Sequence, residues 1–379
     1  MKFRREVLPK KNEGPEDPSR RVFLKKLGMG AIGILSGVEG LDAIAEVAQR
    51  IGLIEKNLTD KELAEYWEQH KKKIQELLPK LREDIAFLES VYKETFIPVL
   101  QKIKDDLVFF EDIARIDARL KEGGITMERF IGFSGNQAAR SMMVDIFHSL
   151  SLYWDPENLQ KVARKSYQEN SRDVRYLGFG NLEGTTDQEI KKLFEARFDF
   201  RWLYGNVLEF EYVDREERVE TYRVAADAAG AGISGVFERN DRHQKEKINF
   251  YKGLGENLKP PLIFEVMTGI LSHELAHKHS WDKGNTLTIQ ERIEMLVEVT
   301  RRLDEEGCLK SDYVERVIPR EGKAKKRTLE EIKYSQVIEY WAEIVQAFEE
   351  DKEGFAKSYP RDYELIKRWR DLILSRYGT

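Results

Sequence analysis

One short stretch of the sequence combines residue types and spacing that suit metal chemistry. In ILSHELAHKHS, residues 270–280, His273 and His277 stand four residues apart, and Glu274 directly follows the first histidine. From the composition of the chain, His-Glu-x-x-His is expected by chance in about one such chain in a hundred. A helix that merely happens to be rich in histidine is therefore the weaker interpretation.

The spacing places both histidines on one side of a helix. Residues four apart share a helix face, so His273 and His277 can bind a single ion. Glu274 is rotated by about 100° from His273, which lets it contact a water molecule on that ion without being a ligand. Zinc suits this arrangement because it accepts three protein ligands and leaves one position for water. His279 falls on the far side of the helix, and we interpret it as a polar residue at the helix end.

The third ligand must come from another part of the chain. The metzincin class would need Gly and His where this chain has Ser280 and Lys283, which excludes that class. The best downstream candidate is the segment EYWAE, in which Glu339 and Glu343 share a helix face with apolar neighbours. Buried carboxylates need a metal or strong hydrogen bonds, so we favour a ligand here over two exposed surface glutamates.

Composition limits the ligands and the partners. The chain has a single cysteine, Cys308, so neither an internal disulfide nor a thiolate metal cluster can form. Any metal must therefore be held by histidine and carboxylate. The formal net charge of -5 gives no reason to expect nucleic acid or an anionic membrane as a partner.

The first half of the chain has a helical pattern. Apolar residues recur at three- and four-residue spacing from Leu63 to about Leu120, and Pro79 and Pro98 interrupt the pattern. We expect two or three helices, or kinked ones, that form an intramolecular bundle; a coiled-coil surface for a partner is the alternative. A further helix is predicted over residues 136–152.

The character of the sequence changes near Tyr176. Alternating residues predict a hairpin of strands at 207–213 and 219–224, and then strands within 228–237 and 247–252. The pattern becomes helical again near Phe264. Two later helices are opened by capping boxes, formed by Thr288 with Glu291 and by Thr328 with Glu331.

These features together resemble the gluzincin branch of zinc metallopeptidases, and within it the catalytic domain of anthrax lethal factor and the Pro-Pro endopeptidases. The strands, the HELAH helix and the later EYWAE helix occur in the family's order. The resemblance covers roughly residues 228–377, not the first half of the chain, and implies a zincin-like metallopeptidase domain, which we place at residues 176–379. The helical pattern places a helical domain before it, at residues 46–175, so the expected fold class is α+β.

The resemblance also implies roles for individual residues. His273, His277 and Glu343 would bind one zinc ion per chain, and Glu274 would be the general base. The strand near Val236 would pair with an extended peptide substrate.

Two positions depart from the family's pattern. The residue after the second histidine is usually uncharged and is Lys278 here, and Gln336 stands where a transition-state tyrosine is expected. Tyr340 and Tyr334 are the nearest candidates for that donor. Zinc binding is therefore better supported than efficient proteolysis.

The N-terminal segment, residues 1–45, resembles a twin-arginine export signal. SRRVFLK, which contains Arg20 and Arg21, matches every specified position of that pattern. The apolar run that follows is too short for a comfortable membrane span, and residues 43–45 offer a small-x-small cleavage site. Export would make the translocation machinery a partner and place the protein in the periplasm or at the cell surface, attached to the membrane if the signal is uncleaved. A buried helix after a basic turn is the alternative.

The favoured interpretation is an exported zinc-dependent endopeptidase that acts on a peptide or protein, with a zinc-activated water and Glu274 as the base. Two alternatives stay open: a catalytically inactive zincin-like protein that binds zinc, and an extracytoplasmic scaffold whose helical half binds a partner. Zinc content and peptide hydrolysis distinguish the three.

Overall fold

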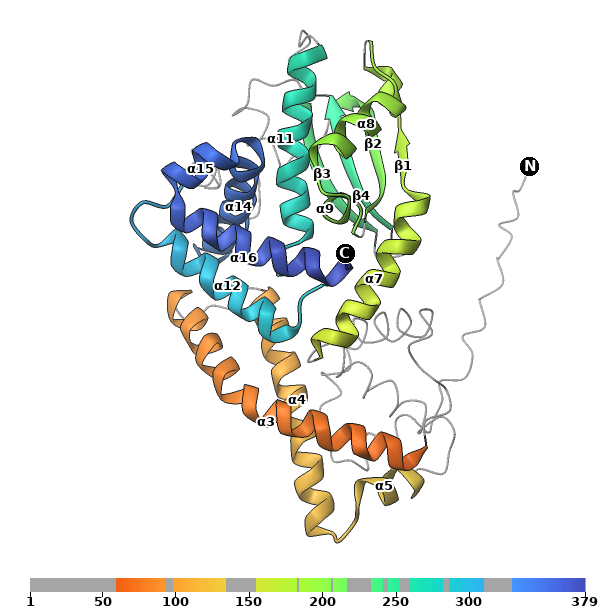
Figure 1. The fold of residues 1–379 in the computed structure, drawn as a ribbon. Coiled ribbons are helices and arrows are strands. Elements are labelled where there is room, and N and C mark those ends of the chain that lie inside the picture. Colours follow the sequence, from red (N-terminus) through yellow and green to blue (C-terminus); the bar gives the residue numbers. More distant parts are fainter. Residues whose placement is uncertain are drawn as a thin grey trace, which may run out of the picture.

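The computed structural model describes residues 59–92, 98–133, 155–182, 184–205, 207–216, 233–240, 245–252, 260–281, 286–309 and 329–378. The chain is mostly helical, with one small sheet (Figure 1), as the α+β prediction expects. Four predicted features lie outside the described residues: the export signal with Arg20 and Arg21, the helix at 136–152, the strand at 219–224, and the capping box at Thr328.

Within the described residues the sheet has four strands, in the order β1-β2-β4-β3. The strands are β1 (Arg175–Leu177), β2 (Val207–Glu216), β3 (Ile233–Asn240) and β4 (Lys245–Lys252). The pairs β1–β2 and β2–β4 are parallel, whereas β3 lies at the edge and runs antiparallel to β4, with Val236 opposite Asn249. The strand predicted at 247–252 is confirmed by β4. Of the strand predicted at 228–237, residues 233–237 lie in β3, and residues 228–232 lie outside the described residues.

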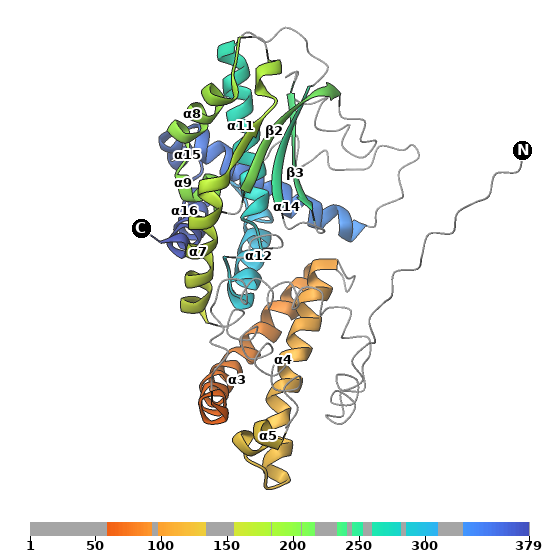
Figure 2. The same ribbon diagram turned by 90° about the vertical axis from the view of Figure 1, so that its right-hand side faces the viewer.

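One face of the sheet is an aromatic core. Phe210 and Phe250 point to this face, where Phe194 packs on them from α8 (Asp187–Arg197) at ring distances of 5.9 and 5.8 Å. Alternate residues such as Glu209 and Glu211 point to the other face, where both pair with Lys247. Helices α8, α9 (Phe200–Tyr204) and α11 (Pro260–Lys278) lie on one side of the strands (Figure 2). The buried rings fix the sheet against these helices, since each contributes about 1.5–3 kcal/mol.

The N-terminal helices are α3 (Asp60–Val91), α4 (Pro98–Glu122) and α5 (Met127–Phe133). Pro79 was expected to interrupt the helical pattern but lies inside α3, whereas Pro98 is the first residue of α4. Leu78 and Leu81, on either side of Pro79, are both buried, so packing compensates for the one hydrogen bond that proline removes. Helix α3 also packs on α12 (Ile289–Leu303), where the Arg301 guanidinium lies 4.5 Å from the Phe87 ring.

Helix α7 (Pro156–Asp173) precedes the expected domain boundary at residue 176, yet it packs on the C-terminal helix α16 (Pro360–Tyr377). Gln160 donates to the Ser375 carbonyl at 3.0 Å, and Arg376 donates to the Pro156 carbonyl at 3.1 Å. By these contacts α7 belongs with the sheet and the C-terminal helices.

The C-terminal helices meet at a buried ionic network. These helices include α14 (Leu329–Glu350) and the short α15 (Lys352–Ser358), which precedes α16. The members of the network are Arg302 on α12, Tyr340 on α14 and Asp362 on α16. The fully buried Asp362 carboxylate accepts from Arg302 Nε and from the Tyr340 hydroxyl, both at 2.6 Å, and from the Leu309 N–H at 3.1 Å. This network fixes three helices against one another.

Asp362→Ala should therefore lower the free energy of unfolding by about 3–5 kcal/mol, because it leaves the Arg302 charge buried without its partner. Asp371→Ala removes an exposed carboxylate from the same helix and should change stability by less than about 0.5 kcal/mol. Urea unfolding of the two variants measures both values. Equal stability of the two variants would show that the network contributes nothing.

Candidate metal centre

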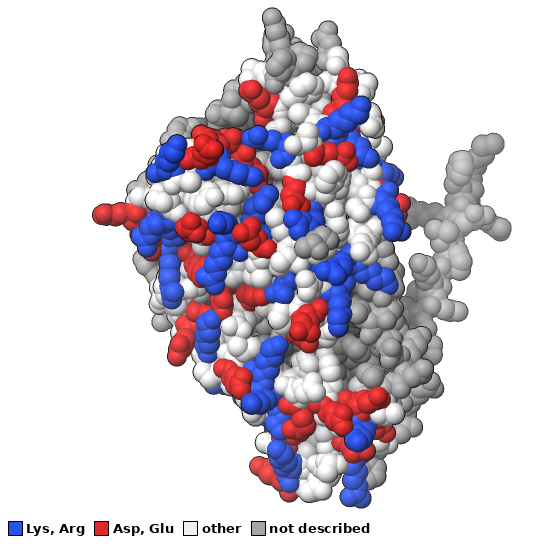
Figure 3. Space-filling model, viewed as in Figure 1, with Lys and Arg blue, Asp and Glu red and all other residues white. Residues whose placement is uncertain are grey.

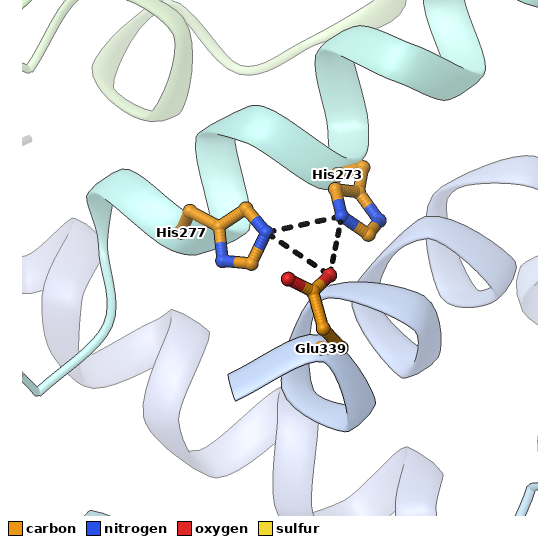
Figure 4. A group of neighbouring side chains, drawn as sticks. All are labelled: His273, His277 and Glu339. Carbon is orange, nitrogen blue, oxygen red and sulfur yellow. Dashed lines mark hydrogen bonds and ion pairs between the residues drawn. The ribbon is translucent and has the colours of Figure 1, made fainter. Parts of the chain in front are cut away.

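The two histidines of the HELAH segment lie on one face of α11, as their spacing predicted. Apolar residues of the same helix, including Leu271 and Leu275, are fully buried and hold α11 in the core. The Nε2 atoms of His273 and His277 lie 3.0 Å apart (Figure 4). Their side chains are 13% and 12% exposed, so both rings are largely shielded from solvent.

The carboxylate that joins the two histidines comes from Glu339 on α14. One of its oxygens lies 3.1 Å from His273 Nε2 and 3.4 Å from His277 Nε2. We expected Glu343 in this position. Instead, Glu343 lies on the other side of the His273 ring, with Oε1 3.5 Å from Nδ1. The group that could hold a metal is therefore His273, His277 and Glu339.

The distances in this group fit a small divalent ion. Zinc binds histidine nitrogen and carboxylate oxygen at about 2.0–2.2 Å in tetrahedral geometry, which separates neighbouring ligand atoms by about 3.3 Å. The three separations here are 3.0, 3.1 and 3.4 Å. The three atoms are therefore spaced as one face of such a tetrahedron would be, and a metal bound there would have its fourth position available for water or substrate.

The electrostatics of the group also favour a cation. Burial would lower the pKa of His273, but Glu339, which is hydrogen-bonded to its ring, and the nearby Glu274 and Glu343 raise the pKa to about 9. Burial would likewise raise the pKa of Glu339, but His277 and His273 hold it well below its usual value. Three carboxylates around two imidazoles therefore stabilise a positive charge at this group, which either a proton or a divalent ion can supply.

Contacts between α11 and α14 bring the ligands together. The Trp341 indole N–H donates to the Ala276 carbonyl at 3.0 Å, and the Trp281 indole N–H donates to the Tyr334 hydroxyl at 3.2 Å. At Gly269, one turn before His273, an added Cβ would lie only 3.0–3.1 Å from side-chain atoms of α14. Sequence reasoning treated Trp341 as an apolar neighbour only and missed this positioning role, although the indole N–H could have signalled a buried acceptor.

The neighbours of the two histidines are also buried. Glu274 is 9% exposed, and its charge contributes to the raised pKa of His273, so its carboxylate lies near that ring. Lys278 is 2% exposed. His279, expected to be a polar helix-end residue, is buried: its Nε2 donates to the Trp202 carbonyl at 2.9 Å, and its ring stacks on the Trp202 ring at 4.2 Å. Burial holds the pKa of His279 well below its usual value, so the ring is neutral.

The two candidate tyrosines differ in position. The Tyr340 hydroxyl is fully buried and donates to Asp362, so it is engaged in the network between α12, α14 and α16 and does not serve the metal group. The Tyr334 hydroxyl accepts from Trp281, and a hydroxyl that accepts can also donate. Tyr334 is therefore the tyrosine that stays a candidate.

The chain matches no protein-family model, no curated protein and no solved structure. No known relative therefore bears on the fold or on the candidate metal group, and both are argued from this chain's own residues.

The roles of the two glutamates can be separated by matched variants. Glu339→Gln should weaken zinc binding by on the order of a hundredfold or more, because it removes a charged ligand. Glu343→Gln should weaken it by about tenfold, as expected for a residue that orients a ligand. Competition with a chromogenic chelator measures both values, and His273→Ala and His277→Ala serve as references for a lost ligand. A larger effect of Glu343→Gln would make Glu343 the third ligand.

Proposed function

We propose that this chain is a zinc-dependent endopeptidase. The observation that carries the proposal is the convergence of His273 Nε2, His277 Nε2 and a Glu339 oxygen within 3.4 Å, with Glu274 next to the first ligand. Two histidines and one glutamate with an open position are the donor set of many zinc hydrolases. The zincin-like assignment of the fold and zinc as the resident metal are parts of this proposal.

The edge strand β3 supports a peptide as the substrate. Among the described strands β3 has a neighbour, β4, on one side only, and it packs against α11, which carries His273 and His277. An extended peptide can add to such an edge through its backbone N–H and C=O groups. This arrangement would lay a peptide bond alongside the helix that holds His273 and His277.

The chain's own residues would divide the work of hydrolysis. Bound zinc would supply Lewis acidity, which acidifies water and polarises the scissile carbonyl. The Glu274 carboxylate would accept a proton from the attacking water and return it to the amine nitrogen as the carbon–nitrogen bond breaks. Glu343 would orient the His273 ring through Nδ1, and the Tyr334 hydroxyl is the candidate donor to the oxyanion.

Glu274→Gln tests this mechanism. The variant keeps the size of the side chain but cannot take up the proton, so hydrolysis of a cleavable peptide should fall by about a hundredfold or more. Zinc content, measured by elemental analysis, should stay at the parental value because Glu274 is not a ligand. Loss of zinc to the extent seen with His273→Ala would contradict the assignment of Glu274 as a base.

The catalytically inactive zinc protein remains the second candidate. It is favoured by the burial of Lys278 directly after His277, and by the engagement of Tyr340 with Asp362. A diverse peptide library distinguishes the two candidates: a full zinc complement without any cleavage identifies the inactive form. Zinc-free protein purified without chelator would instead favour the scaffold, in which the helices α3–α5 bind a partner.

We further propose twin-arginine export to the periplasm or cell surface, on the strength of the SRRVFLK match. Within the described part of the chain, no helix has the length and apolar character needed to cross a membrane.

The paired arginines test the export proposal. Changing both Arg20→Lys and Arg21→Lys keeps the charge but removes the recognition element, so the protein should accumulate in the cytoplasm. Cell fractionation with immunoblotting reads the result. The control is the double variant Lys10→Arg and Lys11→Arg, which exchanges two basic residues outside the SRRVFLK segment and should leave export intact. Unchanged export of the lysine variant would show the match to be fortuitous.

A further inference from the structure

A cavity of about 450 Å³ lies where α7, the start of α9 and the end of α16 meet. Its walls include Arg164, Tyr167, Asp199, Phe200, Arg201 and Tyr377. In Figure 3, Lys and Arg side chains gather where the end of α16 approaches α7. The volume falls within the usual range for small-molecule sites, about 300–1,000 Å³. None of the walls belongs to the metal group.

Among the described residues, the charged walls of the cavity leave one positive charge without a carboxylate partner. Arg201 forms a fork with Asp199 at 2.8 and 3.0 Å, which neutralises both groups, and its Nη1 donates to the Gly378 carbonyl at 2.9 Å. Arg164, which is exposed at the rim, pairs with no carboxylate in the part of the chain that the structure describes. The cavity therefore carries a net charge of about +1 from these three groups, which suits a monoanion better than a dianion.

The remaining walls are aromatic. Phe200 is 49% exposed, and among the large apolar side chains exposed in the described ranges it is the one that lines this cavity. The Tyr167 and Tyr377 rings lie 5.8 Å apart. An exposed aromatic ring beside two others offers an apolar surface to a ligand, and the Tyr167 hydroxyl and the Gln168 amide of the same walls can form hydrogen bonds.

Two of the walls, Tyr377 and Arg201, are held in place by contacts within the protein. Tyr377 is 2% exposed and packs on Gly205, where an added Cβ would lie 2.3 Å from the ring. Arg201 is held at both ends of its guanidinium, by Asp199 and by Gly378. Fixed walls reduce the ordering entropy that a ligand must overcome. A site formed in advance is therefore a better binder than a groove between mobile side chains.

We propose that this cavity binds a small organic monocarboxylate with an aromatic or aliphatic body. The carboxylate faces Arg164, and the apolar body lies on Phe200 and Tyr167. The site is separate from the metal centre and holds whether or not the chain is a peptidase.

N-acetyl-phenylalanine and its neutral amide are matched probes, because they differ only in the charge that Arg164 would recognise. Titration calorimetry with the full chain is run after zinc removal, so that the carboxylate cannot bind the metal. The acid should bind with a dissociation constant on the order of 1 mM or below, and the amide at least about tenfold more weakly. Arg164→Gln and Phe200→Ala should each weaken binding of the acid by about tenfold. Lys357→Gln, which removes a positive charge from α15, should leave it unchanged.

Several results would overturn the proposal: equal affinity for acid and amide, parental affinity in Arg164→Gln, or no binding of the acid up to about 10 mM. Tighter binding of phenyl phosphate than of the acid would overturn the assignment to a monocarboxylate. Repeating the titration with zinc-loaded protein separates this site from the metal centre, since binding here should persist in both forms.

Discussion

The contact between α11 and α14 is the interaction on which the candidate metal centre depends, because each helix supplies only part of the group that could hold a metal. α11 provides His273 and His277, and α14 provides Glu339. The two helices approach closely at Gly269, and the Trp341 N–H binds the Ala276 carbonyl in the turn that carries His277. A rotation of α14 by one residue, about 100°, would turn Glu339 away from both imidazoles. The indole hydrogen bond resists that rotation.

Other contacts hold the same two helices from outside. The end of α11 is attached to α9 through the stack and hydrogen bond between His279 and Trp202. Tyr340, next to Glu339, ties α14 to α12 and α16 through Asp362. Metal sites tolerate displacements of only about 0.5 Å, so a centre built from two helices needs such support on several sides.

The charges in the two buried networks are balanced differently. Asp362 has its cation, Arg302, at 2.6 Å, and its other acceptor positions receive the Tyr340 hydroxyl and the Leu309 N–H. At the metal group, by contrast, Glu274, Glu339 and Glu343 surround two imidazoles and together raise the pKa of His273 to about 9. The first network is internally neutral and serves the fold, whereas the second creates a demand for a cation that a metal ion can satisfy.

Local patterns in the sequence were enough to predict β4, part of β3, and the HELAH helix with both histidines on one face. The residue types at the start of α12 likewise predicted the capping box of Thr288 with Glu291, which the structure confirms. Only the tertiary structure decided between Glu339 and Glu343. They lie one turn apart on one helix face, so periodicity cannot separate them, and the axial offset of α14 against α11 determines which one reaches Nε2 of both histidines. The buried state of His279 and the engagement of the Tyr340 hydroxyl are likewise contacts between distant segments, with Trp202 and with Asp362. Such contacts depend on how helices pack, and packing is set by the whole core rather than by any local stretch of sequence.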